Sequence, residues 1–340
     1  MRTSTIALLA GLVVSGLAAQ DVSAGVKTPP GFANTHAKAL AQAKKDNKPL
    51  YLHFTTDWCG WCRRIEEDVY ANAKGKEALA AFVPASLDCT NNAPGSKANQ
   101  ALMEKYGGSG YPFIVILAPD GAVLESWAGY RPLERFVPTL EKAQKKFDTY
   151  NAFLEKTKSA DPKDLGFQIE AMDVYVAMQQ WDKADIAARK VIELDKDRTH
   201  FGKAKLTQLR VAREKKNFQA VTNLTAEVRK LDPDNAKQLL EIALGEQVEA
   251  IMLQANNKNN ETQYKKALAI LVERTKLANL SDPKQATVDI ASLQMSCGKY
   301  REAWTTLEKW LADNPDSPDA DRTRELIDKL KQAEAKQQKR

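Results

Sequence analysis

The chain has 340 residues, of which 43% are hydrophobic and 28% are charged, and its formal net charge at pH 7 is +6. This length accommodates two domains of ordinary size, and the composition is that of a soluble globular protein and excludes a disordered chain. Lysine and glutamate alternate along the predicted helices without forming a basic stripe between aromatic residues, which argues against nucleic-acid binding.

Residues 1–24 have the pattern of an export signal. Arg2 is followed by an apolar run at 6–17 and then by small residues, and cleavage fits after Ala19 or after Ala24. A membrane anchor is the weaker alternative, because the run is shorter than the roughly 20 apolar residues that a membrane span needs. We therefore expect an exported protein, periplasmic or extracellular, with no membrane span after removal of the signal.

Helix and strand patterns alternate after an extended segment at 25–34. The apolar spacing predicts, in chain order, helix 36–45, strand 50–56, helix 63–69, helix 71–82, strand 83–87, helix 97–106, strand 111–117, strand 122–127 and a helix from 131 onward. The turn Pro119-Asp120-Gly121 joins the last two strands, so these are expected to form a hairpin.

Two cysteines stand three residues apart in Trp58-Cys59-Gly60-Trp61-Cys62, where a strand pattern gives way to a helix pattern. At a helix N-terminus, unpaired amide N–H groups and the positive end of the helix dipole stabilise a thiolate and lower its pKa. Cys59 is therefore the candidate nucleophile, and Cys62, one helical turn later, can close a disulfide with it.

Two other roles for this cysteine pair are a structural disulfide and half of a zinc site. A zinc site needs two more ligands, yet the chain has no second cysteine pair and only three histidines, which are scattered along it. Redox exchange is the favoured interpretation, and we expect no metal.

The order of elements over residues 36–147 resembles the thioredoxin fold. The resemblance is carried by the cysteine motif after a strand, by Tyr106-Gly107, by Tyr111-Pro112 at the start of the next strand, and by the hairpin turn. It implies an α/β thioredoxin-like domain over residues 25–150 that acts as a thiol–disulfide oxidoreductase and needs no cofactor. In such an enzyme Cys59 attacks a substrate disulfide, and Cys62 resolves the mixed intermediate.

The resemblance also implies which residues meet the substrate. Pro112 would follow a cis peptide bond that faces the disulfide, and an ordinary trans proline at a strand start is the alternative. The substrate-binding residues are expected to be Trp58, Gly60, Trp61, Tyr111 and Pro112.

His53 shares one face of its strand with Tyr51 and Thr55. It stands where many thioredoxins place a buried acid that accepts the proton of the second thiol. A histidine could do this nearer neutral pH, or it could be an ordinary core residue, and both interpretations are open. Trp61 stands where strongly reducing thioredoxins commonly have proline, so the direction of electron flow is also open.

The remaining cysteines, Cys89 and Cys297, are predicted to be buried free thiols, and a bridge between them is the alternative. Cys89 ends a predicted core strand and is expected to lie nearer the active site. Arg63 and Arg64 follow the motif and could favour the thiolate, or they could be solvent-facing helix residues.

Residues 151–340 lack strand signals and carry alternating charged and apolar runs. A pattern of an aromatic residue followed three positions later by a small one recurs about every 35–45 residues, which is the period of stacked helix pairs. The four copies are Trp181–Ala184, Phe218–Val221, Tyr264–Ala267 and Tyr300–Ala303.

The last copy has Gly298 in the turn before it and Asn314-Pro315 after it, and it resembles a tetratricopeptide repeat. An irregular helical bundle is the alternative, because the first and third copies lack that proline. We expect an all-α helical-repeat domain over 151–340 that closes with a capping helix at 319–330 and a tail.

Two functions fit this organisation. In the favoured one, the chain exchanges disulfides with protein substrates, an upstream redox partner renews it, and the repeats recruit a peptide or protein ligand. In the other, the chain is a non-catalytic binding scaffold whose thioredoxin-like domain serves for docking. The intact pair of Cys59 and Cys62 favours the first, since a docking module has no need of two thiols.

Overall fold

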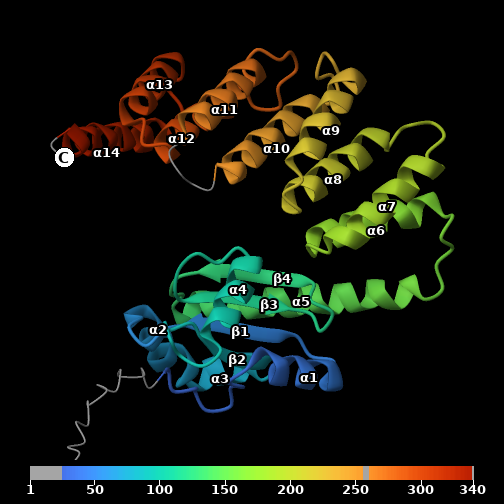
Figure 1. The fold of residues 1–340 in the computed structure, drawn as a ribbon, viewed down its shortest axis with the longest axis vertical. Helices are drawn as coiled ribbons and strands as arrows, with labels where there is room; N and C mark the ends of the chain where they lie inside the picture. The colour runs from blue at the N-terminus through green and yellow to red at the C-terminus, as the bar shows by residue number, and fades with distance from the viewer. Residues whose placement is uncertain (1–24, 256–259, 339–340) are drawn as a thin grey trace, which may run out of the picture. The chain divides into compact units, whose positions relative to one another are not determined.

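A computed structural model describes residues 25–255 and 260–338, and the export signal predicted at 1–24 lies outside them. The chain divides into two compact units, with the boundary between Ala152 and Phe153. The first is an α/β unit and the second consists of helices, so the predicted fold class is confirmed (Figure 1).

The N-terminal unit is built on a four-stranded sheet with the strand order β2-β1-β3-β4. β1 pairs in parallel with β2 and antiparallel with β3, and β3 and β4 form the predicted hairpin. Its elements are α1 (His36–Asp46), β1 (Leu50–Thr55), α2 (Gly60–Ile65), the π-helical turn η1 (Glu66–Tyr70), α3 (Ala73–Leu79), β2 (Val83–Asp88), α4 (Ser96–Lys105), β3 (Phe113–Leu117), β4 (Val123–Ala128) and α5 (Leu133–Thr157).

The helix predicted at 71–82 is wrong in its start and its length. Asn72 has an extended backbone and its side chain accepts a hydrogen bond from the Lys74 amide at 3.0 Å, so α3 begins only after it. Asparagine favours this capping position because its carbonyl satisfies an amide that the helix leaves unpaired. The preceding residues form η1, which continues α2 directly.

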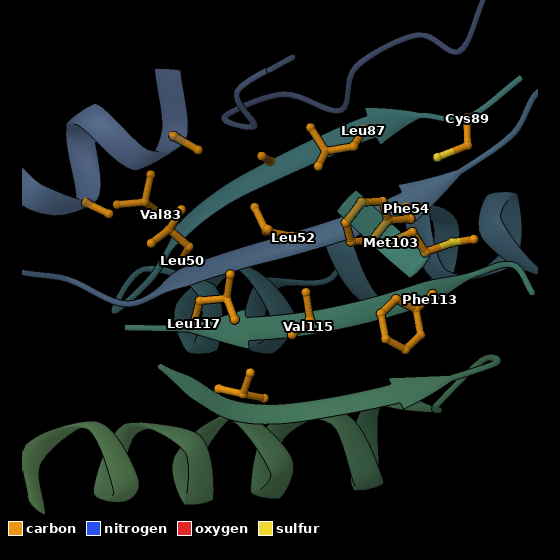
Figure 2. Packing of buried hydrophobic residues seen from close by; sticks show 14 residues of the cluster. Leu50, Leu52, Phe54, Val83, Leu87, Cys89, Met103, Phe113, Val115 and Leu117 are labelled. Carbon is orange, nitrogen blue, oxygen red and sulfur yellow. The ribbon is translucent and has the colours of Figure 1, made fainter. Parts of the chain in front are cut away.

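Both faces of β1 are covered, and alternate residues pack into different layers. On one face Leu50, Leu52 and Phe54 join a core with β2, β3, α1 and α4 (Figure 2). On the other, the Tyr51 ring lies 6.1 Å from that of Tyr70 in η1 and 5.9 Å from that of Phe136 in α5. A strand buried on both sides places the motif that follows it with little freedom.

The C-terminal unit contains only helices among its described residues. They are α6 (Leu165–Ala177), α7 (Trp181–Leu194), α8 (Phe201–Glu214), α9 (Phe218–Leu231), α10 (Leu239–Gln254), α11 (Glu261–Arg274), α12 (Pro283–Ser296), α13 (Tyr300–Asp313) and α14 (Ala320–Gln338). The closing helix predicted at 319–330 therefore continues to Gln338.

The recurring sequence pattern coincides with the second helix of each pair. Its small residues Ala184, Val221, Ala267 and Ala303 are all fully buried. Small side chains let neighbouring helices approach closely, which explains why the pattern is confined to these positions. Assignment of the pairs as tetratricopeptide repeats stays a prediction.

Three of the pairs share one turn of three residues. Its middle residue has a left-handed backbone in each, with φ of 54° at Gln179, 56° at Lys216 and 69° at Gly298. This is the αL ending that often closes a helix. Within the described ranges, no helix is both long and apolar enough to span a membrane.

Candidate active site

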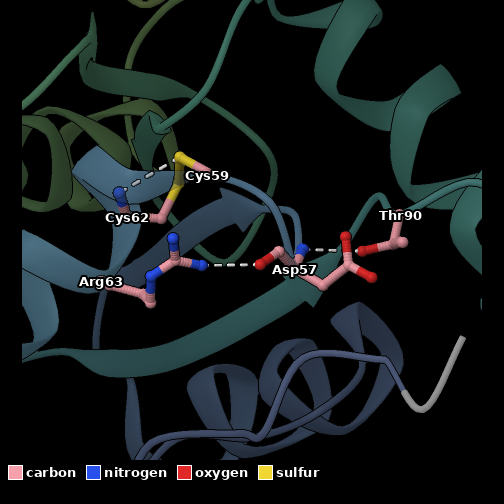
Figure 3. Close-up of a disulfide and its surroundings, with 5 residues drawn as sticks. All are labelled: Asp57, Cys59, Cys62, Arg63 and Thr90. Carbon is pink, nitrogen blue, oxygen red and sulfur yellow. Dashed lines mark hydrogen bonds between the residues drawn. A yellow bond between two sulfur atoms is a disulfide. The ribbon is translucent and has the colours of Figure 1, made fainter.

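Cys59 and Cys62 form a disulfide at the point where β1 gives way to α2 (Figure 3). Cys59 is the N-cap of α2, and its sulfur accepts a hydrogen bond from the Cys62 amide at 3.1 Å. Both residues are almost fully buried. When the disulfide is reduced, the same amide and the helix dipole would stabilise a thiolate at Cys59.

The turn before the motif is fixed by two hydrogen bonds around Asp57. The Arg63 guanidinium donates to the Asp57 carbonyl at 2.7 Å, and the Asp57 amide donates to the Thr90 hydroxyl at 2.9 Å (Figure 3). Arg64 pairs instead with Asp68 at 2.5 Å. Both arginines are solvent-exposed and have oxygen partners, which matches the solvent-facing alternative.

The loop before β3 brings Tyr111 and Pro112 to the motif. The Tyr111–Pro112 peptide bond is cis, as predicted, and the Pro112 carbonyl accepts a hydrogen bond from the Gly129 amide at 2.8 Å. The Trp58 ring meets the Tyr111 ring edge to face, with 5.7 Å between centroids. Two predicted substrate-binding residues from distant segments are thus in contact.

Cys89 lies behind this loop as a buried free thiol. Its thiol and the Tyr111 hydroxyl are hydrogen-bonded, and burial raises the pKa of Cys89 to about 12. Cys297 is the other free cysteine and is only partly buried. Both cysteines are free thiols, as predicted, but the prediction that Cys297 is buried is wrong.

His53 is completely buried on β1, and its ring lies 5.6 Å from that of Tyr70. Neither ring nitrogen has a hydrogen-bond partner. Burial lowers the pKa of the imidazole from 6.5 to about 3, because a charged ring would lose its hydration. At neutral pH the ring is uncharged and one nitrogen carries a free lone pair.

Tyr130 is a site residue that the sequence analysis missed. Its ring lies 5.7 Å from that of Trp61, and its hydroxyl donates to Asp68 at 2.9 Å. Tyr130 follows Gly129 just after the end of β4. An aromatic residue in a loop next to a strand end was the one sequence signal that could have identified it as a site residue.

A search of the described residues finds no group of three or more histidine, cysteine, aspartate or glutamate side chains that could hold a metal ion. Gly60, the remaining predicted site residue, is the first residue of α2. A Cβ at Gly60 would meet nothing within 4 Å, so packing around this position does not require glycine.

Comparison with known proteins finds a known domain family that matches the segment carrying this site. Residues 36–144 match the thioredoxin-like domain. Over 104 residues the chain is 29% identical to the disulfide bond reductase DsbH of Chlamydia pneumoniae. This match covers 29% of this chain and 62% of that protein. Over 93 residues it is 32% identical to the thiol:disulfide interchange protein DsbD 1 of Pseudomonas aeruginosa. This match covers 27% of this chain and 15% of that protein.

A solved structure of a DsbH oxidoreductase is 26% identical, with a TM-score of 0.29, and the match covers 35% of this chain and 92% of that one. The matches span less than two thirds of the length of these two curated relatives. The match to the thioredoxin-like domain lies within the N-terminal unit. The sequence match, the sheet order and the cysteine motif agree that residues 36–144 form a thioredoxin-like domain.

Proposed function

We propose that this chain is an exported thiol–disulfide oxidoreductase that exchanges disulfides with protein substrates through Cys59 and Cys62. The observation that carries the proposal is the disulfide between these residues at the N-terminus of α2. A disulfide at this position can be opened by exchange, because the helix stabilises the thiolate that leaves. The names of the relatives, a disulfide bond reductase and a thiol:disulfide interchange protein, support the same chemistry.

In the reducing direction, the Cys59 thiolate attacks a client disulfide. The Cys59–client S–S bond forms, the client S–S bond breaks, and the released client thiolate takes a proton from water. The Cys62 thiolate then attacks the Cys59 sulfur, which closes the Cys59–Cys62 bond and releases the second client sulfur. Two electrons pass from the dithiol to the client, and an upstream dithiol partner returns them.

A role for His53 as acceptor of the proton that Cys62 loses stays a prediction. Its ring is buried and neutral at pH 7, and neither nitrogen has a hydrogen-bond partner. Its pKa of about 3 favours the alternative of a core residue, because a general base works best when its pKa lies near the operating pH.

The test is reduction of a synthetic peptide disulfide by the full-length, pre-reduced protein. Cys59→Ser should abolish the reaction, and Cys62→Ser should accumulate a mixed disulfide between Cys59 and the peptide. Cys297→Ser is the matched control, because it removes a free thiol of the other unit. Equal rates for wild type and Cys59→Ser would contradict the proposal.

The direction of exchange is tested by the reduction potential of the Cys59–Cys62 pair. The name of the Chlamydia relative favours reduction, for which a potential near that of thioredoxin, about −270 mV, is expected. A potential near about −120 mV would instead assign disulfide introduction.

The helical unit is proposed to recruit a protein or peptide partner. A cleft of about 480 Å³ lies between α10, α11 and α12, and Ile242, which lines it, is 41% exposed. Apolar side chains of all three helices line this cleft, among them Met252, Leu271 and Leu293, and an apolar-lined cleft favours binding of another molecule. Ile242→Asp in the full-length Cys62→Ser variant should lower the amount of trapped client, whereas Ile186→Asp, outside this cleft, should not. Capture of a partner without any exchange would support the non-catalytic scaffold.

A further inference from the structure

Two exposed indole rings flank the reactive cysteine in the motif. Trp58 is 65% exposed and Trp61 is 62% exposed, and among the large hydrophobic residues described Ile186 is exposed as much as Trp61. Water hydrates an indole ring poorly, so exposing two of them beside a disulfide is unfavourable unless another molecule covers them.

Each indole is held against a tyrosine from a different loop. Trp58 meets Tyr111, which precedes the cis proline, and Trp61 packs on Tyr130, which follows β4. The planes of the second pair are inclined by 30°, with 5.7 Å between the ring centroids. Offset pairs of this kind are worth about 0.5–1.5 kcal/mol beyond the area they bury.

The polar ends of both tyrosines are anchored inside the domain. The Tyr111 hydroxyl is hydrogen-bonded to the Cys89 thiol. The Tyr130 hydroxyl donates to the Asp68 carboxylate at 2.9 Å, and that carboxylate also accepts from Arg64. The aromatic rings are therefore fixed before a partner arrives, which lowers the entropic cost of binding.

The two tyrosine-bearing loops are also joined to each other. The Gly129 amide donates to the Pro112 carbonyl at 2.8 Å, so the residue before Tyr130 is bonded to the residue after Tyr111. The four rings thus form one preorganised surface, which we call the aromatic frame and define as Trp58, Tyr111, Trp61 and Tyr130.

We propose that the aromatic frame binds a flexible client segment that carries bulky apolar side chains on both sides of its reactive cysteine. The position of the aromatic frame beside Cys59 identifies what binds there, since a molecule that covers the frame must also present a sulfur to Cys59. Folded proteins bury apolar residues next to a cystine, so such segments belong to clients that are not fully folded. This inference rests on the proposed exchange reaction and identifies Trp61 and Tyr130 as specificity residues for it.

The test uses the full-length, pre-reduced protein and three disulfides. Two are peptides of equal length with one disulfide each, flanked by phenylalanine and leucine in one and by glycine and serine in the other. The third is oxidised glutathione. Single-turnover rates of disulfide reduction are measured for wild type, Trp61→Ala, Tyr130→Ala and Tyr130→Phe, with Ile186→Ala as the control for a remote exposed apolar residue.

Wild type should reduce the apolar peptide about tenfold faster than the polar one, which is the ratio that one well-packed aromatic pair provides. Trp61→Ala and Tyr130→Ala should remove most of this preference. Tyr130→Phe, which keeps the ring, should remove less, and Ile186→Ala should remove none. In Trp61→Ala and Tyr130→Ala the rate with glutathione should fall less than the rate with the apolar peptide, because glutathione is too small to span the frame.

An unchanged preference in Trp61→Ala would overturn the aromatic frame. So would an equal fall with all three substrates, because that outcome assigns Trp61 to the redox potential and not to recognition. Failure of wild type to reduce any of the three disulfides would instead overturn the proposed function itself.

Discussion

At the scale of single residues, His53 is a fully buried imidazole in the core of the thioredoxin-like domain, and burial lowers its pKa to about 3. Such a ring protonates in the unfolded chain, where its pKa is near 6.5, well before it does so in the folded protein.

Folding stability should therefore depend on pH through His53. Between pH 6.5 and about 3 the unfolded state binds a proton that the native state does not, so the free energy of unfolding falls as the pH is lowered. Between pH 7 and pH 5 the loss is about 2 kcal/mol, from about 1.4 kcal/mol per pH unit below the unfolded pKa. It should be visible in denaturant titrations of the oxidised protein.

The control for this prediction is His53→Leu, which replaces the titratable ring with an apolar side chain of similar volume that cannot bind a proton. It should lose about 2 kcal/mol less than wild type over the same pH range. If both proteins lose the same amount, other groups such as His36, whose pKa burial also lowers, would account for the pH dependence.

Cys89 should be an unreactive thiol in spite of its position beside Tyr111. With a pKa of about 12, its thiolate fraction at pH 8 is roughly a thousandfold lower than that of an ordinary cysteine of pKa about 8.5. Alkylation of the oxidised protein with iodoacetamide, followed by mass spectrometry, should label the partly buried Cys297 first. Faster labelling of Cys89 would show that the loop before Pro112 opens.

At the scale of elements, the three-residue turns between paired helices explain why the repeats are unequal in sequence. All three turns need a residue with a left-handed backbone. Gly298 adopts this backbone without strain, whereas Gln179 and Lys216 adopt it at a steric cost because each has a Cβ. The turn hydrogen bonds are the same, since Gln180, Asn217 and Lys299 each donate to a carbonyl five residues earlier.

Exchanging residues between these turns should change stability in opposite directions. Lys216→Gly should stabilise the helical unit by about 0.5–1 kcal/mol, because it relieves the left-handed backbone, and Gly298→Ala should destabilise it by about 1 kcal/mol. Thermal unfolding followed by circular dichroism measures both. Lys215→Gly, at the preceding right-handed residue, is the matched control and should destabilise.

The same scale shows what the sequence could and could not predict. The strand before Cys59 and the helix after it are local signals, and both are confirmed. The cis bond before Pro112, which the resemblance to thioredoxin implied, is also confirmed. The π-helical turn at 66–70 was missed, because it differs from an α-helix by one hydrogen-bond step and not by its pattern of apolar residues. The pairing of Trp61 with Tyr130 joins distant segments, so no local pattern carries it.

At the scale of the whole molecule, α5 belongs to both compact units. Phe136, Phe147 and Tyr150 are buried in the part of the helix that belongs to the first unit. Phe153 begins the second unit and its ring packs on those of Phe167 and Tyr175, at 6.1 Å and 5.4 Å. One continuous helix therefore carries buried side chains of both compact units.

Separate cores predict that stability and redox chemistry can be changed independently. Phe153→Ala should destabilise the helical unit by about 3 kcal/mol, because it deletes a buried ring that packs on two others. The reduction potential of the Cys59–Cys62 pair should stay within error of wild type, since potential follows the groups around the sulfurs. His53→Leu should shift the reduction potential of the Cys59–Cys62 pair and leave the stability of the helical unit unchanged. Glutathione redox titrations measure the reduction potential, and denaturant unfolding measures the stability of the helical unit. A shifted potential in Phe153→Ala would mean that the helical unit acts on the disulfide through α5.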